Sequence, residues 1–546
     1  MKIKRIVSLL LVLTVVGSLL AACSSNNSES GGSSKKQELT MNFRTDPPAL
    51  DVSIAESAAS FTILGAVSEG LYRMDADNKP QPALAAALPE ISADGLTYTI
   101  KLREGLKWAD GSPLTAKDFI YSFRRTLDPA TKATYSFMVA WIKGGNDILA
   151  AEGADAVKAA QDKLGAVALD ETTLQITLEQ PVTFFTESLS FLNFYPQKEE
   201  FVSPLGDTSG TDASKVLGAG PFVLQTWDHD QKLVLVKNDN YWDKDTVKLD
   251  KVTLNILKDN ATGLNLYDSG ASDYQVLDGQ QYVQLKDSKE LVQKQELTAG
   301  YLNFQQTKVP AFKNEKIRKA FAAAIDRDAL VETILQGSTP ATGFVPTGNL
   351  DGNGKQFREV AGDVATKFDV ENAKKLLAEG MKEEGITAMP KLSIMGDDNG
   401  TGPKVLEFLA GQWEQNIGVK VDISPMPHAT RIENELNKNY DIVSTLWGAD
   451  YNDPMTWLDM FVTGSMLNTQ DWSNAEYTKL ITSAQTSIDP VARAADLVKA
   501  EKILLDEGVI APLYSRTLNV MVKDKVQGMI LPAYGVEFEL KWTSIK

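Results

Sequence analysis

The sequence predicts an α/β protein of two or three domains, and three observations support this prediction. The chain has 546 residues, which is enough for two or three domains. Residues 97–102 and 172–178 alternate apolar and polar side chains, as half-buried strands do. Residues 312–330 place apolar side chains on one face of a helix. Because 43% of the residues are apolar, an ordinary value for a folded protein, the chain can build a large core.

The chain opens with a segment typical of a secretion signal. Three of the first five residues are basic, and residues 6–20 form an apolar run that is too short for a membrane-spanning helix. The run ends in Leu-Ala-Ala-Cys, which resembles the cleavage box of bacterial lipoproteins. This resemblance implies that residues 1–22 are a signal peptide and that Cys23 carries a lipid anchor that includes palmitate. The alternative is an ordinary secretion signal with an incidental cysteine.

The cysteine content fits an anchor rather than a site. Cys23 is the only cysteine, which excludes intrachain disulfides, cysteine-rich metal sites and a catalytic thiol. Residues 23–38 are rich in Ser, Gly and Asn and predict a flexible tether. No later apolar run approaches the length of about 18 residues that spans a membrane. We therefore expect a lipid-anchored protein on the extracytoplasmic face of the cell membrane, at a Gram-positive cell surface.

Charge and motif content exclude several classes of function. Lys and Arg number 55 against 72 Asp and Glu, and the formal net charge of −17 argues against nucleic acid as a partner. The two histidines, His229 and His428, are too few for most metal clusters, and no HExxH or GxSxG motif is present. The Gly-x-Gly-Pro sequence at 218–221 is too short for a phosphate loop. We expect no enzyme activity, no metal and no cofactor, with both histidines at the surface.

The first part of the chain alternates strands and helices. Residues 39–44 predict a strand, which a turn at Leu50-Asp51 separates from a helix over residues 55–72. After the strand at 97–102, a turn leads to a helix that starts at Thr115.

The second part is richer in helices. Residues 301–304 predict a strand, and the helix at 312–330 follows it directly. Residues 372–381 and 405–413 predict two more amphipathic helices.

One stretch near the end of the chain suits ligand binding. Residues 441–446 predict a short strand, and a helix is expected to open with Pro454 after a cap by Asn452 or Asp453. Asp450 then lies in a strand-to-helix turn, where a carboxylate and unpaired backbone groups can meet an extended peptide. The simpler alternative is that Asp450 is a turn residue and that the nearby tryptophan is part of the core.

The same stretch carries a family resemblance. Residues 447–454, Trp-Gly-Ala-Asp-Tyr-Asn-Asp-Pro, resemble the ammonium-binding segment of oligopeptide-binding proteins, which are the receptors of peptide ABC importers. Residues 69–72, 82–129 and 312–330 also resemble the large, family 5 solute-binding proteins, and the resemblance extends over residues 39–546. It implies a two-lobed periplasmic-binding-protein-like fold of type II, of the large cluster C kind, with an extra domain in the first lobe.

The resemblance also implies domain boundaries. Lobe 1 (domain I) would comprise residues 39–74, 196–302 and 511–546. The chain would cross back to lobe 1 near the start of the last of these segments. Residues 75–195 would form the extra domain of lobe 1 (domain II). Residues 303–510 would form lobe 2 (domain III), and hinge motion would close the two lobes over a ligand.

Site residues follow from the same resemblance. Asp450 would bind the α-ammonium of a peptide, and the other implied contacts line the groove or pair with the ligand backbone. They are Trp447, Gly448, Ala449, Glu56, Ser57, Ala58, Ala219 and Gly220. Some relatives have Asn where Ala219 stands, which removes a side-chain contact there. The implied partners are an oligopeptide and the membrane permease subunits of an ABC importer, with the protein itself a monomer.

Two departures from the family pattern concern the far end of the ligand. Relatives that bind very short peptides have Arg where Ser444 stands, and residues 396–403 contain no histidine. We therefore expect the ligand's C-terminus to be held loosely and peptide length to be tolerated broadly. Alternative ligands are a signalling peptide (a pheromone), a nickel chelate, haem or an oligosaccharide. A hydrolase or an adhesin on the same scaffold is the alternative of another class.

Overall fold

The computed structural model describes residues 36–76, 78–352 and 354–546, of which residues 37–546 form one compact unit. The predicted signal peptide, Cys23 and nearly all of the predicted tether lie outside the described residues. Within the described part of the chain, no helix is long and apolar enough to cross a membrane.

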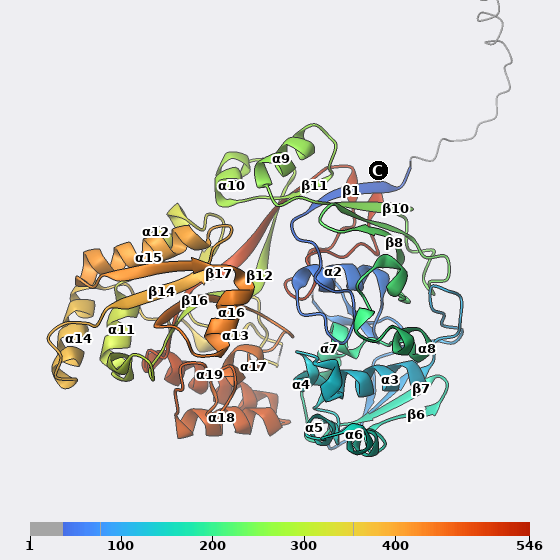
Figure 1. The fold of residues 1–546 in the computed structure, drawn as a ribbon, viewed down its shortest axis with the longest axis horizontal. Coiled ribbons are helices and arrows are strands. Elements are labelled where there is room, and N and C mark those ends of the chain that lie inside the picture. Colours follow the sequence, from blue (N-terminus) through green and yellow to red (C-terminus); the bar gives the residue numbers. More distant parts are fainter. Residues whose placement is uncertain (1–35, 77, 353) are drawn as a thin grey trace, which may run out of the picture. The chain divides into compact units, whose positions relative to one another are not determined.

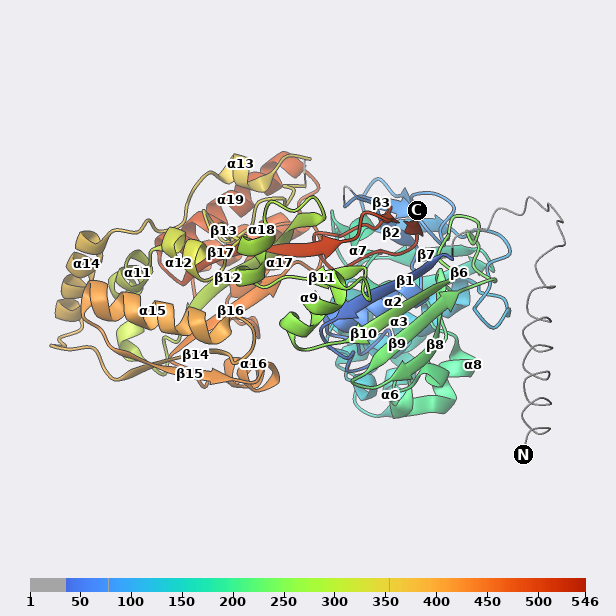
Figure 2. The same ribbon diagram turned by 90° about the horizontal axis from the view of Figure 1, so that it is seen from above.

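One large mixed sheet organises residues 37–546. Eleven described strands form it, and their order along the main path is β15-β14-β16-β12-β17-β11-β1-β10-β9-β8, with β13 paired to β17. One end of the sheet belongs to a first lobe and the other end to a second lobe, and β12 and β17 lie between them (Figures 1 and 2). These two strands are β12 (Leu291–Phe304) and β17 (Ile510–Val522).

The first lobe is built on parallel and antiparallel strands around β1. Leu39, Met41 and Phe43 of β1 are buried, because β1 is paired on both sides and helix α2 packs nearby. The elements of this part are β1 (Glu38–Phe43), α2 (Ala58–Val67), β2 (Tyr72–Met74), α8 (Glu199–Val202), β8 (Phe222–Asp228), β9 (Lys232–Lys237), β10 (Lys251–Ile256), α9 (Asn260–Asp268), β11 (Tyr274–Val276), α10 (Gly279–Leu285), β18 (Val526–Gln527) and β19 (Ser544–Ile545).

The helix predicted over residues 55–72 is wrong at its end. Helix α2 stops at Val67, and the chain becomes extended at Ser68 before β2 begins at Tyr72. Glu69 explains the break, because its buried carboxylate accepts hydrogen bonds from Arg73, Tyr241 and Trp242. These tertiary partners outweigh the local preference for helix.

A small four-stranded sheet with several helices is attached to the first lobe. Its order is β4-β5-β7-β6, and α3 packs near β6 with Phe119 and Phe123 buried. Thr115 and Asp118 form a capping box at the start of α3, as the predicted helix start requires. The elements are β3 (Pro80–Pro82), β4 (Glu90–Ile91), β5 (Thr97–Lys101), α3 (Ala116–Leu127), α4 (Ser136–Val139), α5 (Gly145–Leu149), α6 (Ala154–Gln161), β6 (Ala166–Asp170), β7 (Thr173–Thr177) and α7 (Phe185–Ser188).

The second lobe carries most of the long helices. Helices α11, α14 and α15 cover β14, β15 and β16, and together they enclose a separate apolar core (Figure 1). The elements are α11 (Glu315–Ala323), α12 (Arg327–Thr333), β13 (Thr339–Pro340), α13 (Phe357–Ala361), α14 (Val370–Glu383), β14 (Leu392–Asp397), α15 (Gly402–Ile417), β15 (Val421–Met426), α16 (His428–Leu436), β16 (Ile442–Gly448), α17 (Met455–Leu458), α18 (Ala475–Thr486) and α19 (Pro490–Asp506).

The single helix predicted over residues 312–330 is also wrong. The chain forms a short 3-10 turn at Pro310–Lys313, then α11, then α12. Asn314 and Asp326 each cap the next helix with a side-chain oxygen, and Asp326 accepts from the backbone N–H of Ala329 at 2.9 Å. Because a cap residue adopts non-helical backbone angles, the two caps divide the apolar face among three segments.

Candidate ligand-binding site

Asp450 lies in the turn between β16 and α17, as the sequence predicts. Asp453 caps the helix, because its carboxylate accepts a hydrogen bond from the backbone N–H of Met455 at 2.9 Å. Arg493 of α19 holds the same carboxylate with two nitrogens at 2.6 and 2.8 Å. Pro454 directly precedes Met455 and already has helical backbone angles (φ −59°, ψ −21°), so the bond from Met455 to Asp453 acts as the cap. The bonds from Met455 and from Arg493 therefore hold Asp453 in place, and with it the turn that presents Asp450.

The Asp450 carboxylate is buried without a cation. Only 7% of the residue is exposed, and no Lys or Arg among the described residues forms an ion pair with it. The hydroxyl groups of Thr456, at 3.4 Å, and of Tyr135 hydrogen bond to it. Burial raises the pKa of Asp450 to about 7, although both hydroxyls act in the opposite direction. A cation bound beside Asp450 would offset the free-energy cost of burying its ionised carboxylate.

Tyr135 is a site residue that sequence reasoning missed. It precedes α4 in the region of the small sheet, more than 300 positions before Asp450, and only the tertiary fold brings the two together. Nearby, the rings of Phe184 and Tyr451 stack at 4.2 Å between centroids, and Trp141 meets Tyr451 edge-on at 5.9 Å. Because these contacts join the small-sheet region to the second lobe, they cover the Asp450 turn.

Strand β16 has an unpaired edge directly before the turn. On one side it pairs with β12 along its whole length, from Ile442 to Gly448. On the other side β14 pairs only with Ile442 and Val443. Residues 444–448 therefore have no strand neighbour on that side among the described residues. An extended peptide can add to such an edge through its main chain.

The structure distributes the remaining second-lobe residues around this edge. Trp447 is half-buried, and its indole N–H donates to Thr456 at 3.5 Å, so it belongs to the same cluster as Asp450. Gly448 ends β16. The backbone N–H of Ala449 donates to the carbonyl of Leu297 at 2.8 Å and is already used.

The first-lobe residues fall into two groups. Glu56 accepts a hydrogen bond from Thr134, the neighbour of Tyr135, at 2.9 Å, and lies close to the Asp450 cluster. Ser57 caps α2 and Ala58 begins that helix.

Ala219 and Gly220 instead pack against the end of α2. The backbone N–H of Gly220 donates to Val67, and a Cβ on Gly220 would lie 2.6 Å from the backbone of Val67 and Ser68. The structure thus gives Gly220 a packing role. A ligand contact for Ala219 and Gly220 stays a prediction.

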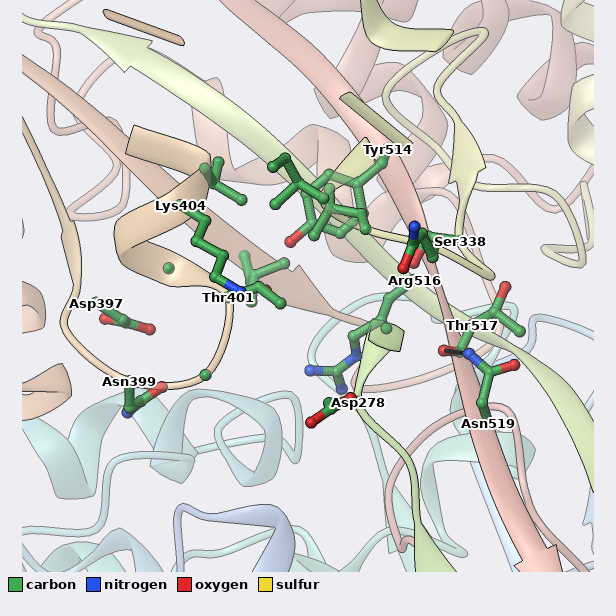
Figure 3. Close-up of a pocket in the computed structure, with 18 of the residues that line it drawn as sticks. Asp278, Ser338, Asp397, Asn399, Thr401, Lys404, Tyr514, Arg516, Thr517 and Asn519 are labelled. Carbon is green, nitrogen blue, oxygen red and sulfur yellow. Dashed lines mark hydrogen bonds between the residues drawn. The ribbon is translucent and has the colours of Figure 1, made fainter. Parts of the chain in front are cut away.

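A cavity of about 490 Å³ opens at the other end of the unpaired edge (Figure 3). Ser444 and Leu446 of β16 line it, together with the end of β14, the first turn of α15, and Tyr514 and Arg516 of β17. First-lobe residues complete its walls, among them Arg44 and Asp278, so the cavity lies between the two lobes beside the strand that joins them.

The histidines behave as predicted. His229 and His428 are both exposed, and each bonds to an aspartate, Asp46 and Asp397 respectively, at 3.0 Å. Within the described residues, no group of three or more His, Cys, Asp or Glu side chains is arranged to hold a metal ion.

Comparison with known proteins establishes the family. The model for bacterial extracellular solute-binding proteins, family 5 (middle), matches residues 79–468. The dipeptide-binding protein DppE of Bacillus subtilis (strain 168) is 32% identical over 505 residues, which cover 92% of this chain and 91% of that protein. The structure of Listeria monocytogenes OppA bound to peptide is similar with a TM-score of 0.82 and 35% identity, covering 94% of this chain and 100% of that one. The pheromone receptor PrgZ gives a TM-score of 0.82 at 30% identity, with the same coverage of both chains.

These similarities confirm the predicted α/β, two-lobed periplasmic-binding-protein-like fold. They also confirm the prediction that the chain is not an enzyme, because proteins of this family bind solutes rather than transform them. The chain therefore belongs to family 5 of the bacterial extracellular solute-binding proteins.

Proposed function

We propose that this protein captures oligopeptides between its two lobes and delivers them to the membrane permease subunits of an ABC importer. One observation carries the proposal: Asp450 is a buried carboxylate without a cation, at the end of an unpaired strand edge. A peptide brings an α-ammonium and a main chain that match these two features. The peptide-binding relatives DppE and OppA support the same ligand class.

The ligand would add to residues 444–448 of β16 as an extended strand. Its α-ammonium would replace the hydroxyls of Tyr135 and Thr456 as the main partner of Asp450. Glu56 and Ser57 approach from the first lobe, and Trp447 and Gly448 border the edge itself. Because main-chain hydrogen bonds do not depend on side chains, such a groove accepts many sequences.

The domain boundaries proposed from the sequence fit this mechanism. Residues 39–74, 196–302 and 511–546 form lobe 1, and residues 75–195 form its extra domain. Residues 303–510 form lobe 2. Strands β12 and β17 cross between the lobes and are the hinge about which they open.

Binding is expected to depend on pH through Asp450. The pKa of this carboxyl is raised to about 7 without ligand, and the peptide ammonium binds its ionised form. Each unit of pH below about 7 should therefore weaken binding by up to about tenfold, because a proton must be displaced first. Titrations between pH 5 and pH 8 at constant salt measure this. Affinity that stays level over that range would contradict the role of Asp450.

We also propose that lipid on Cys23 anchors the protein to the outer face of a Gram-positive cell membrane, as a monomer. Support comes from the Leu-Ala-Ala-Cys box and from the absence of any other cysteine in the sequence. Cys23→Ser should move the protein from the membrane fraction to the medium, and mass spectrometry of the wild type should detect acyl chains at Cys23. Retention of the variant in membranes would contradict this proposal.

The central test is a calorimetric titration of the purified protein with a peptide mixture and with the same mixture after N-acetylation. We expect tight binding of the first, loss of binding of the second, and recovery of the peptides intact. No binding of either would overturn the proposal, and cleaved peptides would favour a hydrolase.

A receptor for one signalling peptide is the second candidate, because the similarity extends to the pheromone receptor PrgZ. Such a receptor would select a single sequence from the mixture, whereas a nutrient receptor would retain many. Mass spectrometry of the retained peptides separates the two roles.

A further inference from the structure

Three aromatic rings meet across the boundary between the two lobes. Phe184 and Trp141 come from residues 75–195, the proposed extra domain, and Tyr451 comes from the turn that carries Asp450. The ring of Phe184 stacks on that of Tyr451 at 4.2 Å between centroids, with an angle of 8° between the ring planes. Trp141 meets Tyr451 at 5.9 Å and Phe184 at 5.5 Å, edge-on in both cases. Helices α4 and α7 of the first lobe face α17 of the second lobe at this place (Figure 1).

The burial of these rings depends on contact between the lobes. Tyr451 is 2% exposed and Phe184 is 9% exposed. Every ring that contacts Tyr451 among the described residues belongs to the first lobe, so separation of the lobes would expose the Tyr451 ring to water. An aromatic side chain buries a large apolar area, and a stacked pair gains further stability from its geometry. Contact between the lobes is therefore favourable at this place for any ligand that lies between them.

The boundary extends beyond the three rings. Arg493 of α19, in the second lobe, has its guanidinium carbon 5.5 Å from the centroid of the Phe184 ring. A Cβ built on Gly95 would lie 3.8 Å from the side chain of Ile488, which is an ordinary contact distance. In both contacts the first-lobe partner comes from residues 75–195. The extra domain therefore meets the second lobe at several points around the Asp450 turn.

We propose that the extra domain acts as a latch for the closed form, formed by Phe184 and Trp141 on one side and Tyr451 on the other. Phe184 and Trp141 are positioning residues, because they act through Tyr451 on its neighbour Asp450 and not on the ligand itself. This step rests on the proposed function, since it requires a peptide that is enclosed when the lobes close. A peptide leaves only after the latch opens, so the latch sets the residence time of every ligand alike.

The test measures how fast peptides leave the purified protein. Peptides of three and eight residues with unrelated sequences, labelled with a fluorophore at the C-terminus, are bound and then displaced by an excess of unlabelled peptide in a stopped-flow instrument. Phe184→Ala should raise the dissociation rate of both peptides by about tenfold, because a buried aromatic pair is lost. A side chain that contacted the ligand would instead affect the two peptides differently. Phe184→Leu keeps most of the apolar volume without the stack, and it gives the same test if the alanine variant does not fold.

A double-mutant cycle assigns the effect to the contact between the lobes. In a Tyr451→Ala background, Phe184→Ala should change the dissociation rate by less than about twofold, because the partner ring is already absent. If each ring served only its own lobe, the effects of the two substitutions would multiply. Phe368→Ala is the matched control, since it removes a ring of the second lobe that is 43% exposed, and it should leave both rates unchanged.

The outcomes separate this proposal from the function on which it rests. If the wild type binds peptides but Phe184→Ala leaves their dissociation rates unchanged, or changes the rate of only one peptide, the extra domain is not a latch and the peptide function stands. Effects that multiply in the double variant would overturn the latch in the same way. If no peptide binds the wild type, both proposals fail together.

Discussion

Asp450→Asn is expected to weaken binding of peptides with a free amino terminus by about 2–5 kcal/mol, or about 30- to 5,000-fold. The amide is neutral and nearly the same size, so the turn and its contacts with Tyr135 and Thr456 can persist. The ligand ammonium, in contrast, would enter a buried place without a counter-charge. Most of the loss is the cost of burying that unpaired cation.

Calorimetry with a five-residue peptide measures this loss, and two controls sharpen it. N-acetylated peptide should bind wild type and variant equally weakly, because neither complex then contains the ion pair. Asp422→Asn changes an exposed carboxylate on β15 that is paired with Lys391, and it should leave peptide affinity unchanged. Peptide affinity that survives Asp450→Asn would remove Asp450 from the site, although the fold and the family would stand.

Arg493→Met is expected to lower the free energy of unfolding by about 3–5 kcal/mol, because it leaves the Asp453 carboxylate buried and unpaired. Only 1% of the Arg493 side chain is exposed, and its guanidinium makes two bonds to Asp453 and one to the carbonyl of Ala484 at 3.0 Å. The Met side chain fills similar space but supplies no donor. Since Asp453 also caps α17, the loss should spread to the turn that carries Asp450.

Urea unfolding followed by circular dichroism measures the change in stability. Lys502→Met is the matched control, because Lys502 lies on the same helix and forms an exposed ion pair with Asp506 at 2.8 Å. Its loss should cost less than about 1 kcal/mol. Equal effects of the two variants would show that burial of the Arg493 pair has no special role.

Local patterns in the sequence predicted most of the elements near the site. The strand before Asp450, a cap by one of the two candidates, Asp453, and the helix start at Thr115 all appear in the structure. Each depends on residues close together in the chain, whose propensities and hydrogen bonds are local.

The two helix predictions that were wrong have different causes, one tertiary and one local. The chain at Glu69 is not helical, because its carboxylate accepts hydrogen bonds from Tyr241 and Trp242. Asp326 caps a second helix within a stretch whose apolar spacing is continuous. The apolar spacing is the same in both conformations, so periodicity alone could not reveal either break. Tertiary partners and cap geometry decided them.

By itself the sequence determined the two-lobed α/β class, the binding role and the turn that presents Asp450, because these depend on local patterns and on a segment with a family resemblance. Only the tertiary structure revealed that Tyr135 reaches Asp450, that β14 leaves residues 444–448 without a neighbour, and that Phe184 and Trp141 meet Tyr451. Each of these brings together groups that are far apart in the chain, and their meeting depends on how the sheet and its helices pack.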